Sequence, residues 1–518
     1  MKEVKRPSKK EMWFFALGQL GWSILGGLVS NLLVNYYLPD STDGGLRIFI
    51  PQGAILLGLT VIGLITAFGR VFDAVTDPII ANFSDNCKSK KGKRIPFLRW
   101  SALPFAVVTV LVFCATFENK GLNVAWLAIF LMLFYLGMTA YCTPYNALIP
   151  VLGHEQEDRM NISTYISLTY IVGTGVAFGA NIIWTQLANM TGLDYYLAAK
   201  LVIIVEAAIA LVCMWIPAFG IKETDYNIEQ QKSENPFKSL KKTFSNGHFR
   251  LFVLSDILYW IGITIFNTGF LYYVSNLLNC YDWYMVLFIF MTLVTFICYI
   301  PANILTKKFG KKRMVIIGFI TFALAFGICA LAGKITFIPN LVYGFIICVF
   351  VGVPLAILGI VPQAIVADIA EQDYIKTGEN HDGMFYAART FAFKLGQGLA
   401  MIIFTSLAVV GQYTTQNDLG EDVIANSGVG YRISLLVALA FSVLAAVALI
   451  FYNEKDVMGT INEAHAKETV VNADGTISQG EGVAEEAPVE EAPVEVIPVE
   501  EAPAEKIEES TDTEEKAE

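Results

Sequence analysis

Long apolar runs dominate this chain, and short polar connections separate them. The runs at 102–117 and 435–452 contain no charged residue. With their flanks they approach the ~20 residues that an α-helix needs to cross a ~30 Å hydrocarbon layer. Counting such runs predicts an all-α integral membrane protein with twelve transmembrane helices, at 12–38, 53–83, 95–116, 122–149, 161–188, 195–219, 250–278, 283–306, 313–333, 338–366, 384–411 and 431–452.

A polar stretch divides these helices into two groups of six. We expect an N-terminal six-helix half at 1–220, a cytoplasmic linker at 221–249 and a C-terminal six-helix half at 250–455. Short basic loops follow the second helix of each group, which indicates a faint internal repeat. From 456 to 518 the chain is acidic and repeats Glu-Glu-Ala-Pro-Val, so we expect a disordered cytoplasmic tail there.

The charge is distributed unevenly. The 518 residues carry a net charge of −11 and are 55% hydrophobic. Residues 454–518 hold 20 acidic and 4 basic residues, a charge of −16, so the remainder carries +5. Lys and Arg concentrate before the first predicted helix, after the second, and between the eighth and the ninth. By the positive-inside rule both termini are then cytoplasmic, and we expect the protein in the cell membrane. The eight cysteines are scattered, without metal-ligand spacing.

Three charged side chains interrupt the second predicted helix. Arg70, Asp73 and Asp77 have the spacing i, i+3, i+7, so they share one face of an α-helix. Facing lipid, each central charge would cost about 2.5–3.5 kcal/mol, so this face must contact protein or water. Two adjacent carboxylates repel each other and suit a proton or a hard cation such as Na⁺. A buried ion-pair network that only braces neighbouring helices is the alternative interpretation.

The eleventh predicted helix supplies an opposite charge. Lys394 lies inside this helix and has no carboxylate near it in the same helix. A lysine at that depth needs an acidic partner, so we expect it to pair with Asp73 or Asp77. An arriving cation would then compete with Lys394 for the carboxylates, which is a physical route to coupling.

Two further charged positions lie within or near the predicted helices. We expect Arg389 to pair with Asp368 or Glu371 as a cytoplasmic gate or brace. Glu206 has no evident partner, and we interpret it as a protonated carboxyl in a helix contact, with a proton relay as the alternative.

Polar and aromatic side chains gather in a few of the predicted helices. Aromatic faces stacked over a ring, with amides and hydroxyls at its edge, are suited to a sugar-like solute. Each such residue could equally belong to an interfacial belt or to a helix–helix contact. The candidate substrate-binding residues are Trp22, Ser23, Tyr141, Cys142, Tyr145, Asn146, Tyr259, Asn267 and Gln397.

Several motifs resemble those of one transporter family. They are Gly69-Arg-x-x-Asp-x-x-x-Asp-Pro78, Tyr141-Cys-Thr-Pro-Tyr-Asn-Ala-Leu-Ile-Pro150 and Lys394-Leu-Gly396. In this order they resemble the glycoside-pentoside-hexuronide:cation symporters, the melibiose permease group of the major facilitator superfamily. The resemblance covers nearly the whole membrane body and implies the fold of that superfamily, with two six-helix halves.

The resemblance also implies roles for single residues. Asp73 and Asp77 would form the cation site and could hold Na⁺, with Thr139 and Thr76 beside them. Lys394 would link this site to the solute pocket, with Arg70 nearby. Thr76 stands where the melibiose permease has an asparagine that affects Na⁺ selectivity, which leaves Na⁺ and H⁺ both open.

The departures from the family concern the solute. Two sugar-binding carboxylates are replaced by Ser23 and Cys142, a tryptophan is replaced by Asn146, and an expected arginine falls near Ser167. Asn380 replaces a cytoplasmic arginine. Galactoside transport is therefore not implied.

These observations favour a cation-coupled symporter, driven by Na⁺ or H⁺, that imports a sugar or glycoside-like solute by alternating access. We expect a monomer in the lipid bilayer, with no cofactor beyond the coupling cation and no nucleic-acid partner. Two alternatives remain. One is a carrier of a lysolipid-like amphiphile, and the other is a non-transporting sensor with the acidic tail as its output. An enzyme is not expected, because no nucleophile–base pair, metal cluster or phosphate loop stands out.

Overall fold

The computed structural model describes residues 6–39, 41, 46–52, 59–153, 156–226, 243–335, 337–378, 382–416 and 422–468. The N-terminal half begins with α1 (Lys9–Gly27), which continues as the π-helical η1 (Leu28–Leu32) and then α2 (Leu33–Tyr37). It is completed by α3 (Val61–Asp85), α4 (Ile95–Val112), α5 (Lys120–Leu152), α6 (Gln156–Thr191) and α7 (Tyr195–Gly220), followed by the short η3 (Glu223–Asp225).

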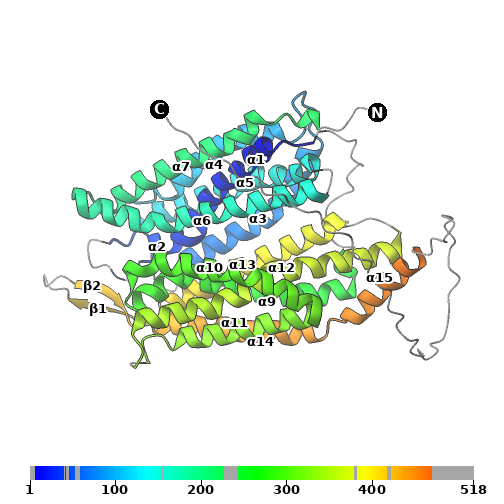
Figure 1. Ribbon diagram of the computed structural model, residues 1–518. Helices are drawn as coiled ribbons and strands as arrows, with labels where there is room; N and C mark the ends of the chain where they lie inside the picture. The colour runs from blue at the N-terminus through cyan, green and yellow to red at the C-terminus, as the bar shows by residue number, and fades with distance from the viewer. Residues whose placement is uncertain are drawn as a thin grey trace, which may run out of the picture. The chain divides into compact units, whose positions relative to one another are not determined.

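The C-terminal half begins with α9 (Gly247–Tyr272), which also ends in a π-helical segment, η4 (Tyr273–Leu277). The short η5 (Tyr281–Trp283) precedes α10 (Tyr284–Phe309), and the half continues with α11 (Lys311–Ala330), α12 (Asn340–Thr377), α13 (Asp382–Ala408) and α14 (Val429–Ile450). An antiparallel hairpin of β1 (Gln412–Gln416) and β2 (Asp422–Asn426), with Gln412 opposite Asn426, lies between α13 and α14. Figure 1 shows the two groups of helices, one coloured blue to green and the other green to orange.

Each of the twelve predicted spans overlaps one long helix of the described chain. Eleven of these helices are long and apolar enough to cross a membrane. The twelfth is α3, in which every 18-residue window contains Arg70, Asp73 and Asp77. The least lipid-compatible helix is therefore the one that carries the charged motif.

Three parts of the chain differ from the sequence-based expectation. Helix α12 continues to Thr377, beyond the predicted end at 366, and the β-hairpin was not predicted. Residues 454–468 form a further helix, α15, so the expectation of disorder from 456 is wrong for its first residues. Apolar burial explains the helix, because Val457 and Ile461 are almost fully buried. Residues 469–518, most of the predicted linker, the start of the second predicted span and Asn380 lie outside the described residues.

The two halves pack their helices in the same way. In the N-terminal half α1 packs on α6 and α7, α4 packs on α5 and α7, and α3 packs on α5. In the C-terminal half α9 packs on α13 and α14, α11 packs on α12 and α14, and α10 packs on α12. The six-helix repeat that the basic loops indicate is thus present in the packing, with α1 equivalent to α9 and α3 equivalent to α10.

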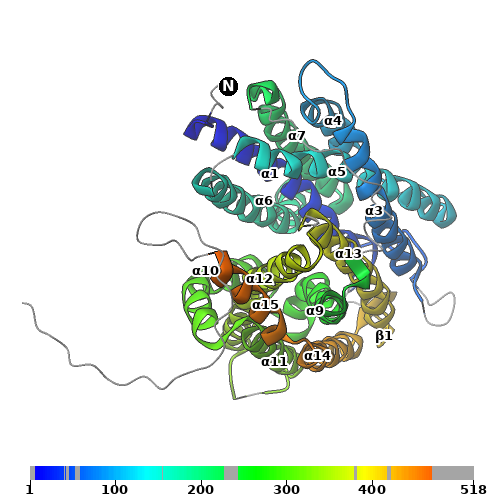
Figure 2. The ribbon, with the colours of Figure 1, turned by 90° about the vertical axis from the view of Figure 1, so that its right-hand side faces the viewer.

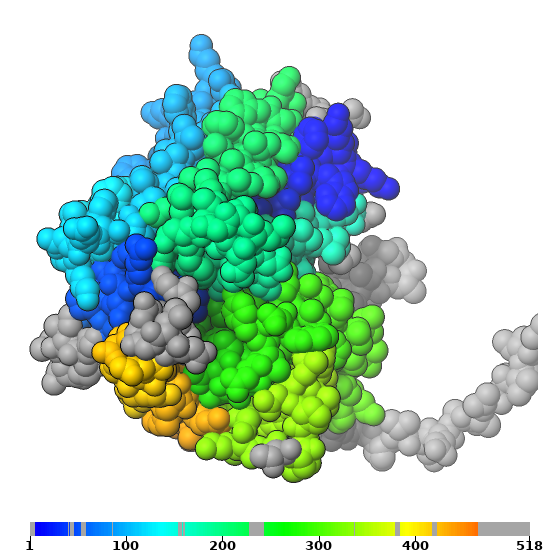
Figure 3. Space-filling model, turned by 90° about the vertical axis from the view of Figure 1, so that its left-hand side faces the viewer, coloured from blue at the N-terminus to red at the C-terminus, as the bar shows by residue number. Residues whose placement is uncertain are grey.

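The main contact between the halves joins α3 to α13 (Figure 2). Further hydrogen bonds between the halves lie at the side where α2 ends and α3 begins, which we call the outer side. Tyr272 donates to the carbonyl oxygen of Leu38 at 2.6 Å, and the hydroxyls of Thr60 and Thr405 lie 2.8 Å apart. Figure 3 shows this side, where the N-terminal half, in blue to teal, adjoins the C-terminal half, in green to orange.

Candidate functional site

A cluster of opposite charges lies where α3 meets α13. The ammonium nitrogen Nζ of Lys394 lies 2.9 Å from Oδ2 of Asp73 and donates a hydrogen bond to Oδ2 of Asp77 at 2.6 Å. Lys394 comes from the C-terminal half and both carboxylates come from the N-terminal half. Because α3 and α13 pack closely along this length, the lysine reaches both acids at once, where the sequence predicted a pairing with either.

Hydroxyl groups from α5 complete the surroundings of the carboxylates. Thr139 lies within hydrogen-bond distance of both, at 2.8 Å from Oδ1 of Asp73 and 3.1 Å from Oδ1 of Asp77. Thr143, one turn further along α5, lies 3.5 Å from Oδ1 of Asp77 and was not among the predicted site residues. The hydroxyl of Thr76 instead donates to the backbone carbonyl of Asp73 at 3.1 Å. In this conformation Thr76 therefore does not donate to the carboxylates.

The site combines a closed end with an accessible one. The side chain of Asp73 is fully buried, whereas that of Asp77 is 24% exposed. Arg70 lies further along the same helix face, with its guanidinium 3.9 Å from Asp73 and 5.1 Å from the centre of the Tyr135 ring. Two positive and two negative side chains thus compensate each other in a region where an unpaired charge would be costly.

Four of the predicted solute-binding residues contact other parts of their own half in this structure. Tyr141 donates to the carbonyl of Met214 at 2.9 Å and Tyr145 to that of Phe15 at 2.7 Å, and both tyrosines are fully buried. Ser23 is buried and donates to the carbonyl of Leu20 at 3.0 Å, within its own helix.

The fourth is Tyr259, which packs against Phe319 and Phe322 inside the C-terminal half. A sequence cannot distinguish such aromatic residues from ligand-stacking ones, because both need the same side chain.

The other candidates keep part of their surface exposed. Thr139, Thr143 and Asn146 have the spacing i, i+4, i+7, so they share one face of α5, and Asn146 is exposed. Asn267 on α9 is also exposed, and Trp22, Cys142 and Gln397 are half-buried.

Indole groups of α1 and α9, two helices that hold candidate residues, have unused donors. Within the described residues three buried indole nitrogens have no hydrogen-bond partner, those of Trp22, Trp184 and Trp260. Trp260 stacks on Phe393, whose neighbour in the chain is Lys394, with ring centres 4.6 Å apart. A bound solute could accept hydrogen bonds from such donors.

The predicted gate pairing is wrong. Arg389 forms a two-pronged ion pair with Asp256 of α9, at 2.8 and 3.0 Å, rather than with Asp368 or Glu371. Asp368 instead accepts from the ammonium of Lys311 at 2.7 Å. The reason is packing: α13 lies against α9, which brings Arg389 to Asp256. Both pairs lie within the C-terminal half, so neither bridges the two halves.

Glu206 is buried, and within the described residues neither of its carboxyl oxygens has a hydrogen-bond partner. It lies on α7, which packs on α1, α4 and α6 in the N-terminal half. A cavity of about 530 Å³ lies elsewhere, lined by α10, α12 and α15 residues such as Asn303, Ala364 and Met458. Neither feature contributes to the charged cluster.

Comparison with known proteins agrees with the fold. The family described as MFS/sugar transport protein matches residues 14–453. The isoprimeverose transporter of Lactiplantibacillus pentosus is 23% identical over 479 residues, which cover 90% of this chain and 93% of that protein. The sodium-dependent lysophosphatidylcholine symporter 1 of Xenopus tropicalis is 24% identical over 440 residues, covering 77% and 80% respectively.

A solved structure supports the same architecture. The D323A mutant of the nucleoside transporter NupG superimposes with a TM-score of 0.60 at 12% identity, covering 86% of this chain and 100% of that one. At this identity the likeness concerns the fold alone. The family match, by contrast, extends over most of the chain and marks a multi-pass membrane transporter, not an enzyme. The chain therefore belongs to the MFS/sugar transport protein family, the melibiose permease-like transporters of the major facilitator superfamily.

Proposed function

We propose that the protein is a cation-coupled symporter whose cation binds between Asp73 and Asp77. The observation that carries this proposal is the bridging position of Lys394, at 2.9 and 2.6 Å from the two carboxylates. A monovalent cation or a proton bound there replaces the ammonium as the compensating charge. Thr139 and Thr143 supply the oxygen atoms that a hard cation such as Na⁺ prefers.

Displacement of Lys394 provides the coupling. While the lysine holds both carboxylates, it also holds α13 of one half against α3 of the other. A cation that takes its place frees the ammonium to interact with a solute and loosens this contact between the halves. By linkage, a solute that engages Lys394 raises the affinity for the cation by the same factor.

Access is expected from one side at a time. In this conformation hydrogen bonds such as that of Tyr272 close the outer side. The positive-inside rule places the termini, and thus the opposite side, in the cytoplasm. The state described is then the one in which the site would exchange with the cytoplasm.

For the solute we propose a sugar or glycoside. The unpartnered indole donors of Trp22 and Trp260, with the exposed amides of Asn146 and Asn267, suit a ligand rich in hydroxyl groups. The isoprimeverose transporter, a relative along 90% of the chain, points in the same direction.

A lysolipid-like solute is the second candidate. The positions where the melibiose permease carries sugar-binding acids hold Ser23, turned into its own helix, and Cys142. The loss of these acids removes the usual sugar contacts, and one relative is a lysophosphatidylcholine symporter.

A thermal-shift panel tests the function and separates the candidates. The purified protein is heated with glycosides, pentosides, uronides or lysophosphatidylcholine, each in Na⁺, Li⁺ or choline and at acidic or neutral pH. A ligand at 100 times its dissociation constant stabilises by about 2.7 kcal/mol, so a shift that needs both solute and cation identifies the pair.

The matched variants are Asp73→Asn, Asp77→Asn and, as control, Asp282→Asn at an exposed aspartate of η5. We expect the two site variants to lose the cation-dependent shift and the control to keep it. A cation-dependent shift that survives in both site variants contradicts the proposed site.

A further inference from the structure

Two π-helical segments interrupt equivalent helices of the two halves. In the N-terminal half η1 follows α1, and in the C-terminal half η4 follows α9. Each contains the first four residues of the same pentapeptide, Val-Ser-Asn-Leu-Leu, at 29–33 and at 274–278. Such segments are rare and occur frequently at functional sites. The pentapeptide repeat does not alter the apolar pattern of either helix.

The N-terminal segment touches the cation site. Nη2 of Arg70 donates a hydrogen bond to Oγ of Ser30 at 3.4 Å. The same guanidinium lies 3.9 Å from Asp73. Only one side chain therefore separates Ser30 from the carboxylate that Lys394 compensates.

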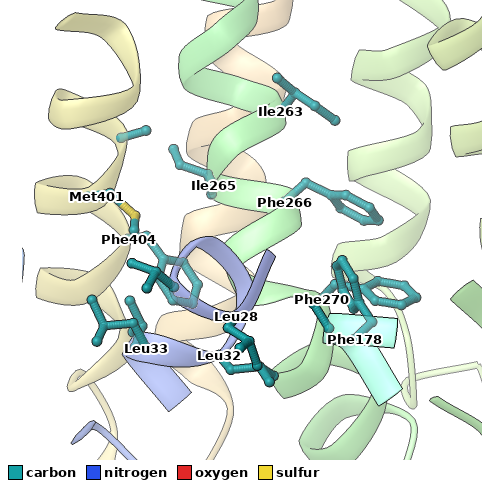
Figure 4. Close-up of a cluster of buried hydrophobic side chains, with 14 of the residues drawn as sticks. Leu28, Leu32, Leu33, Phe178, Ile263, Ile265, Phe266, Phe270, Met401 and Phe404 are labelled. Atoms are coloured by element: carbon teal, nitrogen blue, oxygen red, sulfur yellow. The ribbon is translucent and has the colours of Figure 1, made fainter. Parts of the chain in front are cut away.

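The same segment also closes the outer side. Figure 4 shows Leu28 and Leu32 of η1 and Leu33 of α2 beside Phe404 of α13, and η1 also packs on α9 of the other half. Each of the three leucines is at most 1% exposed. A movement of η1 would therefore remove apolar contacts between the halves.

The C-terminal segment has different partners. Ser275 donates to the carbonyl of Tyr272 in its own helix at 3.4 Å, and the amide of Asn276 donates to the carbonyl of Asn426 at 2.9 Å. Asn426 belongs to the β-hairpin of the same half. The two equivalent serines thus have different partners: Ser30 accepts from Arg70 of the site, and Ser275 donates to a carbonyl of its own helix.

We propose that Ser30 is a positioning residue that couples the cation site to the closure of the outer side. This inference rests on the proposed cation site. A cation between Asp73 and Asp77 displaces the ammonium of Lys394 but leaves it in the cluster, so the cluster carries one positive charge more. This charge repels the guanidinium of Arg70, which then releases Ser30. A π turn holds one residue more than an α turn, so its return to α geometry rotates the following residues by ~100°. Leu32 and Leu33 then leave the interface, and the outer side opens.

Hydrogen–deuterium exchange on the full-length protein measures this movement directly, because amide exchange reports local opening. The variants are Ser30→Ala, the conservative Ser30→Thr and the matched control Ser275→Ala. Each is compared in choline and in Na⁺ or Li⁺, and at neutral and acidic pH. Exchange is read in 28–38, which contains η1, and in 61–85, which is α3.

Without cation, we expect Ser30→Ala to raise exchange in 28–38 by ~5-fold, the factor for a lost hydrogen bond of about 1 kcal/mol. Ser30→Thr and Ser275→Ala should leave it near the wild-type rate. In the wild type, the cation that changes exchange in 61–85 should also raise it in 28–38. In Ser30→Ala the change in 61–85 should persist while 28–38 no longer responds.

Three results would overturn the inference. The first is unchanged exchange and an unchanged cation response in Ser30→Ala. The second is a wild-type response confined to 61–85, which leaves the cation site intact and removes only its link to η1. The third is the absence of any cation response in both segments, which contradicts the proposed function as well. If Ser30→Ala does not fold, Ser30→Cys replaces it with the same expectation, because a thiol accepts hydrogen bonds weakly.

Discussion

Replacement of Lys394 by methionine tests the central ion pairs. Methionine keeps most of the length of the side chain and removes the ammonium that lies 2.9 Å from Asp73 and 2.6 Å from Asp77. Asp73 is fully buried, so the variant leaves two carboxylates with only Arg70 as a more distant compensating charge. The protein must then bind a cation, take up a proton or lose stability.

The expected magnitude follows from the burial of the site. Removing one partner of a buried ion pair costs about 3–5 kcal/mol. A cation at 100 times its dissociation constant returns about 2.7 kcal/mol to a protein that binds it only when folded. Because no ammonium competes in the variant, its cation should bind more tightly than in the wild type. We therefore expect lower stability in choline and a larger cation-dependent shift.

The assay is thermal unfolding of detergent-purified protein over a titration of NaCl or LiCl, with choline chloride holding ionic strength constant, and over a separate pH series. Lys200→Met serves as control, because the ammonium of Lys200 donates to the hydroxyl of Thr116 at 2.6 Å rather than bridging the two site carboxylates. Wild-type stability of Lys394→Met without cation, or a cation shift no larger than that of the wild type, would refute competition between lysine and cation.

Three further predictions concern other parts of the molecule. Asp256→Ala should lower stability by about 3–5 kcal/mol, since it leaves the buried Arg389 uncompensated, and the double variant Asp256→Leu/Arg389→Met should recover most of it in thermal unfolding. Hydrogen bonds from Gln372 and His248, with the charge of Lys376, lower the pKa of Asp456. The contribution of Asp456 to the docking of α15 is therefore present above the ordinary pKa of ~4 and is lost as the pH falls through the lowered pKa. Proteolysis of α15 across that pH range should detect the loss, and Asp456→Asn should abolish the pH dependence. Gly21→Ala should destabilise by about 1–3 kcal/mol, because its Cβ would meet the backbone of Ala210, whereas Gly175→Ala, with open space around it, should not.

The charged cluster could be predicted from the sequence because a charged side chain inside a membrane needs an opposite charge or water beside it. Arg70, Asp73 and Asp77 cannot face lipid, and Lys394 needs an acid that its own helix does not offer. The need for opposite charges therefore predicted that Lys394 pairs with the acids of α3, and this pairing joins the two halves in the structure. The same argument assigned α3 as a membrane helix although three charged residues lower its mean hydropathy.

The partner of Arg389 could not be predicted in the same way. Several acids were available to it, and the choice between Asp256 and Asp368 depends on which helix α13 packs against. Tyr141 and Tyr145 illustrate a second limit. Their rings and hydroxyls suit a ligand and a helix contact equally, and the sequence does not show that the carbonyls of Met214 and Phe15 accept from them.

The balance of charge in the cluster also has an electrical consequence. Arg70 and Lys394 cancel Asp73 and Asp77, so the empty carrier holds no net charge at this depth. Once one monovalent cation is bound, the same region carries +1. Moving one charge through a membrane potential of 100 mV is worth about 2.3 kcal/mol. An interior-negative voltage should then drive the loaded step inward and leave the return of the empty carrier nearly indifferent to voltage.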